Sequence, residues 1–242
     1  MKTMVYAKRN FKELMSDPLS LIFTIGLPSF LLVFMVMLND SLGVNDAFKV
    51  ENFVPSTIIF SFAFITMFSG MLIAKDRSTA FLMRMFISPL KAFEYILGYI
   101  IPLLIMALIQ IIILYTIGFM IGLSFTINVL ISIPFLLLIA LLFIGIGLLL
   151  GSLLKDQQVG PVSSILIQIV AFLSGMWFSL DLVGGLFKQI GYVLPFAHGV
   201  DMIRLILQGH YIEMLYALWI VSLYTLVSII LSIIFFKKNM KE

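Results

Sequence analysis

The stretch 53-FVPSTIIFSFAFITMFSGMLIA-74 contains no Asp, Glu, Lys, Arg or His. About 20 apolar residues are enough for one helix to cross a bilayer, so this stretch predicts a transmembrane helix. Five further segments have similar length and an equally uncharged interior, which predicts an all-α membrane protein with one six-span domain over residues 1–242. The predicted spans are Leu19–Leu38, Phe53–Ala74, Tyr95–Gly122, Val129–Leu154, Val159–Leu180 and Met214–Phe236.

The composition agrees with a membrane protein. Of 242 residues, 62% are hydrophobic and 11% are charged, far from the mixture found in soluble domains. The chain has no cysteine, which excludes disulfides, thiolate metal sites and a cysteine nucleophile. Two histidines, His198 and His210, are too few for a metal cage. We therefore expect no metal or other cofactor on this chain.

The basic residues are distributed as orientation signals rather than as one nucleic-acid-binding face. Lys and Arg outnumber Asp and Glu in the N-terminal segment, in the loop after the second span and in the C-terminal tail. The loop after the first span instead carries three acidic residues and a single lysine. The positive-inside rule therefore predicts a multi-pass protein of the cell membrane with both termini in the cytoplasm.

The N-terminal segment has the pattern of an amphipathic helix. Ala7, Phe11 and Leu14 fall at helical spacing, and the pattern stops at Asp17-Pro18. Residues 1–18 are therefore predicted to form an interfacial helix, although a simple basic anchor for the first span fits equally well. The opposite, basic face is formed by Lys8, Arg9 and Lys12.

A second amphipathic pattern follows the second span, in the predicted cytoplasmic loop 75–94. Phe81 and Met85 lie four residues apart, as do Leu82 and Phe86, and Pro89 closes the short helix. This loop is longer than a helical hairpin needs, and an amphipathic helix fits a groove on a partner. A segment lying on the membrane surface would show the same pattern.

Residues 181–213 are too apolar for a solvated loop and too broken by glycine and proline for a span. Irregular backbone at membrane depth must lie against protein or a wet cavity, so a partly re-entrant segment on the outer side is expected. His198, Asp201 and Arg204 recur every three residues within it. Asp201 and Arg204 are therefore predicted to form a structural ion pair, with substrate contact as the alternative.

The energy for any pumping must come from outside this chain. No Gly-Lys dipeptide occurs, so the phosphate-binding Walker A motif is missing and the chain is not itself an ATPase. The spans also lack the ionisable groups that proton- or ion-driven transporters place in the bilayer. A separate protein is therefore expected to supply the energy.

Two motifs make the chain similar to the permease subunit of type-2 ATP-binding cassette exporters. The first resembles the coupling-loop signature of that family: Asp76-Arg77, Phe81-Leu82, Arg84, Ser88-Pro89 and Glu94-Tyr95-Ile96-Leu97-Gly98. The second resembles its C-terminal signature: Ser174-Gly175, Phe178, Leu194-Pro195, His198-Gly199 and Arg204.

The resemblance implies that the loop after the second span docks on a separate cytoplasmic ATPase, which binds ATP and Mg. It also implies an outer gate in the broken segment, with Pro195, His198, Asp201 and Arg204. The residues expected to couple the chain to the ATPase are Arg77, Phe81, Leu82, Arg84, Met85, Pro89 and Glu94. A passive channel or a membrane assembly factor, neither of which needs an ATPase, is the competing function.

The resemblance further implies that two permease copies, identical or paired relatives, enclose a pathway lined largely by the second and fifth spans. Small and polar residues let membrane helices approach each other closely. The predicted dimer interface and pathway residues are Ser163, Ser164, Gln168, Ser174 and Gly175.

Overall fold

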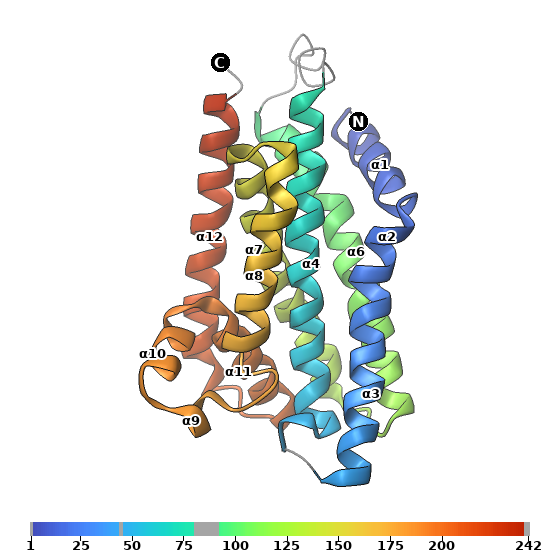
Figure 1. Cartoon of the computed structure of the whole chain (residues 1–242), viewed down its shortest axis with the longest axis vertical. Helices are drawn as coiled ribbons and strands as arrows, with labels where there is room; N and C mark the ends of the chain where they lie inside the picture. Colours follow the sequence, from blue (N-terminus) through green and yellow to red (C-terminus); the bar gives the residue numbers. More distant parts are fainter. Residues whose placement is uncertain (1, 44–45, 80–91, 240–242) are drawn as a thin grey trace.

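The structure is a computed structural model that describes residues 2–43, 46–79 and 92–239. Within these ranges every regular element is a helix, which confirms the predicted all-α class. The long helices stand side by side, and both chain termini lie at one end of the bundle, here called the termini end (Figure 1).

A helix at the surface comes first, and long helices then run along the bundle, with short helices before the last one. The first long helix is continuous in three parts, α2, η1 and α3. The bounds are α1 Lys2–Met15, α2 Pro18–Leu21, η1 Ile22–Gly26, α3 Leu27–Leu42, η2 Asp46–Phe48, α4 Val50–Ser78, α6 Ala92–Met120, α7 Ile127–Leu153, α8 Asp156–Leu173, α9 Leu180–Val183, α10 Gly185–Val193, α11 Pro195–Gln208 and α12 Met214–Asn239.

Five helices of the described chain are long and apolar enough to cross a membrane, or six if the pair α10–α11, bent by 83°, counts as one span.

The helix predicted as the fifth span, α8, has 18 residues and a polar first turn, and it is about 27 Å long. It ends at Leu173, so the predicted end at Leu180 is wrong. Gly175 adopts a φ of 76°, a left-handed conformation that ends a helix, and residues 174–179 are irregular. The five long helices are Pro18–Leu42, Val50–Ser78, Phe93–Met120, Ile127–Leu153 and Met214–Lys238.

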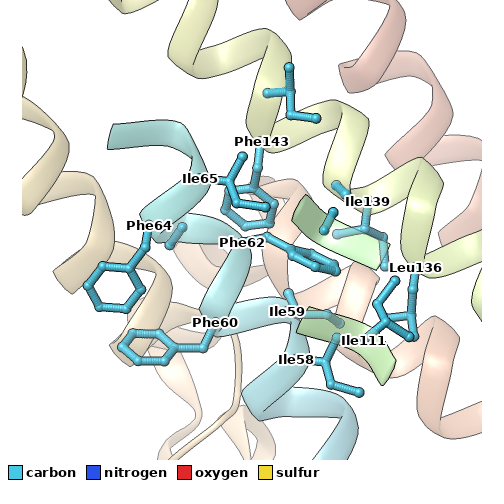
Figure 2. Close-up of a cluster of buried hydrophobic side chains, with 14 of the residues drawn as sticks. Ile58, Ile59, Phe60, Phe62, Phe64, Ile65, Ile111, Leu136, Ile139 and Phe143 are labelled. Atoms are coloured by element: carbon cyan, nitrogen blue, oxygen red, sulfur yellow. The ribbon is translucent and has the colours of Figure 1, made fainter. Parts of the chain in front are cut away.

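The central helix is α4, which contacts α3, α6, α7, α8 and α11. Bulky apolar side chains surround it on all sides, the pattern of a helix buried in a larger structure. In Figure 2, Ile58, Phe62 and Ile65 of α4 lie among apolar side chains of α6 and α7. The core therefore forms around α4. A residue that binds an end of α4 is thereby joined to the centre of the bundle.

Glycines bring α4 and α7 into backbone contact. A Cβ atom on Gly151 would overlap the Gly70 carbonyl oxygen and the Ile73 side chain. One turn away, the Thr66 hydroxyl donates a hydrogen bond of 2.9 Å to the carbonyl oxygen of Phe143. Small residues that permit such an approach are a general means of pairing helices in membranes.

We predict that Gly151→Ala destabilises the protein by about 1–3 kcal/mol, because the added methyl group has no room between α4 and α7. Gly160→Ala is the matched control, since a Cβ on Gly160 meets no atom within 4 Å and alanine favours the helix. The unfolding temperature of the purified protein, followed by tryptophan fluorescence, measures the difference. Equal unfolding temperatures for the two variants would show that α4 and α7 are not closely packed.

Candidate functional site at the termini end of α4

A buried carboxylate near the end of α4 joins three helices. The side chain of Asp76 is 2% exposed and accepts two hydrogen bonds from the Arg9 guanidinium of α1, at 2.7 and 2.9 Å. The hydroxyls of Tyr6 in α1 and Tyr99 in α6 also donate to it, at 3.0 and 2.8 Å. These four residues, Tyr6, Arg9, Asp76 and Tyr99, are called the Asp76 cluster below.

The cluster satisfies the buried charge. A carboxylate removed from water is costly unless charged or hydroxyl donors replace the lost water, and a bidentate guanidinium does so most strongly. Burial and the charge of Asp76 raise the pKa of Tyr6, so its hydroxyl stays protonated and can donate. Burial lowers the pKa of Arg9, but the hydrogen bonds and charge of Asp76 outweigh this effect and raise it overall. Both donors therefore remain in the form that binds the carboxylate.

The Asp76 cluster also fixes α1 on the bundle. The amide of Asn10 donates to the Gly98 carbonyl oxygen of α6 at 3.1 Å, and Ala7 and Leu14 are buried, as the amphipathic pattern predicts. Arg9 was predicted to lie on the basic face opposite the apolar residues, and in the structure its guanidinium binds Asp76 of the bundle. The buried carboxylate of Asp76, which lies 67 residues away in sequence, turns Arg9 toward the protein.

Arg77 points to the other side of α4. Its Nη1 atom donates to the carbonyl oxygens of Gly151, Ser152 and Leu154, at 2.7, 2.6 and 3.3 Å. These carbonyls end α7, where a helix lacks intrahelical donors, so Arg77 serves as a cap for α7. Arg77 was predicted to contact an ATPase, and in the structure its guanidinium lies against the chain's own α7.

The other predicted coupling residues are only partly within the described chain. Glu94 lies in the first turn of α6 and is half-buried. The loop that carries the amphipathic pattern falls between the described ranges 46–79 and 92–239. The predicted coupling residues outside the described residues are Phe81, Leu82, Arg84, Met85 and Pro89.

At the opposite end, Arg204 of α11 binds the start of α4. It donates to the Asn52 carbonyl oxygen and the Ser56 hydroxyl, the latter at 2.9 Å, and to the Gly175 carbonyl oxygen at 3.2 Å. Gly175 lies in the irregular segment, so its carbonyl oxygen is available to a side chain. Arg204 therefore joins α11, α4 and the end of α8.

The predicted ion pair between Asp201 and Arg204 is wrong. No such pair forms in the described structure; Asp201 accepts a hydrogen bond of 3.0 Å from the Tyr192 hydroxyl of α10 instead. Spacing along one helix could not reveal that Asn52, Ser56 and Gly175 surround Arg204, because they lie far away in sequence. Sequence reasoning likewise missed Tyr192, whose carbonyl oxygen lies 2.9 Å from His198 Nε2. Pro195, at the start of α11 where the chain bends, lies in the same part of the chain.

The residues predicted for the dimer interface lie in α8 and in the segment that follows it, some on the buried side and others on the exposed side. Ser163, Ser174 and Gly175 are buried, whereas Ser164 and Gln168 are exposed. The Ser164 hydroxyl donates to the Gly160 carbonyl oxygen of its own helix at 3.0 Å. Among the described residues, Gln168 has no hydrogen-bond partner. The exposed face of α8 therefore carries an unsatisfied amide among apolar side chains such as Ile165 and Ile169.

A family model described as ABC-2 type transporter matches residues 1–208. The chain therefore belongs to the ABC-2 type transporter family, of which it is the permease component, a multi-pass membrane subunit and not a nucleotide-binding domain. Membership of this family implies pairing with an ATP-binding cassette ATPase in a membrane. Comparison with curated proteins gave no match.

We predict that Arg9→Gln lowers the free energy of unfolding by about 2 kcal/mol, because a charged hydrogen-bond donor to a buried carboxylate is lost. The matched control is Lys75→Gln. Lys75 is the residue before Asp76 and forms an exposed ion pair with Glu13, so its loss should cost less than about 1 kcal/mol. Chemical denaturation of the purified protein measures both. A cost for Arg9→Gln no larger than that for Lys75→Gln would contradict the role of the Asp76 cluster.

Proposed function

We propose that this chain is the membrane-spanning subunit of an ATP-driven exporter in the cell membrane, with both termini in the cytoplasm. The observation that carries the proposal is the pair Asp76-Arg77 at the termini end of α4. These adjacent side chains lie at the start of loop 75–94, which would dock on the ATPase, and they bind α1, α6 and α7. A movement of that loop would therefore reach several helices at once.

The distribution of charge supports an external energy source. The predicted spans have no Asp, Glu, Lys, Arg or His in their interiors, so they lack the groups with which membrane proteins most often carry protons through the bilayer. ATP and Mg would be bound by the partner ATPase, whose movement would be passed to α4 by the coupling residues of loop 75–94.

The exposed face of α8 supports a pathway between two permease copies. An amide such as that of Gln168 is costly to leave without a partner in lipid, and polar side chains in membrane helices mostly bond to other helices or line polar cavities. A second copy, identical or a paired relative, would face Ser164 and Gln168 across the pathway. The outer group around Pro195, His198, Asp201 and Arg204 would form the gate at the far end.

We predict that the affinity-tagged chain, purified from its native membranes, brings with it a subunit that carries a Walker A motif and hydrolyses ATP. Phe81→Asp should remove the subunit and its ATP hydrolysis, because a charge placed on an apolar docking surface disrupts a groove contact. Lys237→Gln, which changes an exposed charge at the termini end of α12, is the control and should retain both. Mass spectrometry and ATP hydrolysis of the eluate are the measurements. Folded protein in the membrane without any ATPase would favour a passive channel or an assembly factor.

Cysteine crosslinking tests the pathway between copies. In this cysteine-free chain, Ser164→Cys and Gln168→Cys should form disulfide-linked dimers in the membrane. Ser163→Cys is the matched control, because this neighbouring position is fully buried within one copy and should not crosslink. Crosslinks at 163 but not at 164 or 168 would place the interface elsewhere.

A further inference from the structure

Two kinds of contact hold α7 against α4. Along the helices, the glycines Gly70, Gly147 and Gly151 bring the two backbones together, and Thr66 bonds to the Phe143 carbonyl oxygen. At the termini end, Arg77 closes the pair through the carbonyl oxygens of Gly151 and Ser152 in α7 and of Leu154 directly after it. A cation at the carboxyl end of a helix is also favoured by the helix dipole.

The neighbouring helix α8 is held differently. It packs alongside α4, but within the described parts of these helices no hydrogen bond or ion pair joins α8 to α4 directly. An indirect link lies at the opposite end, where Arg204 of α11 binds Asn52 and Ser56 of α4 and the carbonyl oxygen of Gly175, two residues after α8. The chain passes from α7 to α8 through Leu154 and Lys155, both in extended conformation. Apolar contacts without directional bonds allow one helix to shift against another more easily than hydrogen-bonded backbone contacts do.

We propose that Arg77 is a positioning residue that fixes the end of α7 to α4, so that α4 and α7 move as one body while α8 shifts against them about Leu154 and Lys155. This inference rests on the proposed function, since it assigns the route by which movement of the ATPase-docking loop reaches the pathway. It changes the role first expected for Arg77. Arg77 binds the end of the chain's own α7. The last carbonyl oxygen that Arg77 binds is that of Leu154, and the proposed pathway helix α8 begins two residues later.

The alternative is that Arg77 only stabilises the end of α7. Stability measurements cannot separate the two roles, because both predict a less stable variant. Distances between helices can separate the two roles, because only a positioning role requires the α4–α7 distance to stay constant while the α4–α8 distance changes.

The test uses pulsed electron paramagnetic resonance on the permease–ATPase complex in lipid nanodiscs. Spin labels are placed on introduced cysteines at the exposed positions Ser78 of α4 and Leu153 of α7, and in a second sample at Ser78 and Gln157 of α8. In the wild-type background, the 78–153 distance should be narrow and unchanged by ATP, whereas the 78–157 distance should change with ATP.

Arg77→Gln should then populate a second, longer 78–153 distance, since hydrogen bonds to a charged group change an equilibrium constant by about tenfold or more. The ATP-dependent change at 78–157 should become smaller, while ATP hydrolysis continues. Arg77→Lys keeps the charge and should retain part of the wild-type behaviour, and Lys237→Gln should match wild type.

Two results would overturn the inference. One is a 78–153 distance that changes with ATP in the wild-type background, and the other is an Arg77→Gln distance distribution identical to wild type, whatever the stability of the variant. The first is measured without any variant at Arg77, so the test stands even if Arg77→Gln does not fold. Failure of the proposed function would look different: no ATPase would bind and neither distance would respond to ATP, while the nucleotide-free distances would still report whether Arg77 fixes α7.

Discussion

The buried carboxylate of Asp76 is the interaction on which the termini end of this protein depends. It lies on the most buried helix of the bundle, where an unpaired charge could not be tolerated, and it must therefore be met by donors from other elements. Those donors come from α1 and α6, and the following residue, Arg77, binds α7. Two adjacent charged residues thus organise four helices around one point.

Different kinds of contact hold the middle of the bundle and its two ends. Between the ends, α4 is held by apolar side chains and by glycine-mediated backbone contact with α7. Charged side chains act at the two ends, Asp76 and Arg77 at one and Arg204 at the other, and each binds elements distant in sequence. Such an arrangement suits a transporter subunit, because forces applied at one end of α4 are carried by a helix that is fixed at both ends.

The sequence predicts the long helices well because their signal is the length of an uncharged segment, which depends on no other part of the chain. It fails where a distant partner decides the outcome. Helical spacing gave Arg9 no partner beyond its own helix and paired Arg204 with Asp201, because spacing compares residues only within one helix. The acceptors that these arginines bind, Asp76 for Arg9 and Ser56 for Arg204, belong to α4. The end of α8 was missed because an apolar pattern continues through Gly175, whose backbone conformation interrupts the helix.

In the proposed function, the junction of α1, α4 and α7 at the termini end transmits movement without coming apart. Hydrogen–deuterium exchange of the permease–ATPase complex, compared between the nucleotide-free and ATP-bound states, measures whether it does so. Amides in residues 2–15, 70–78 and 147–153 should remain equally protected in both states, while exchange in α8 changes. Increased exchange in those three segments on ATP binding, with α8 unchanged, would contradict it.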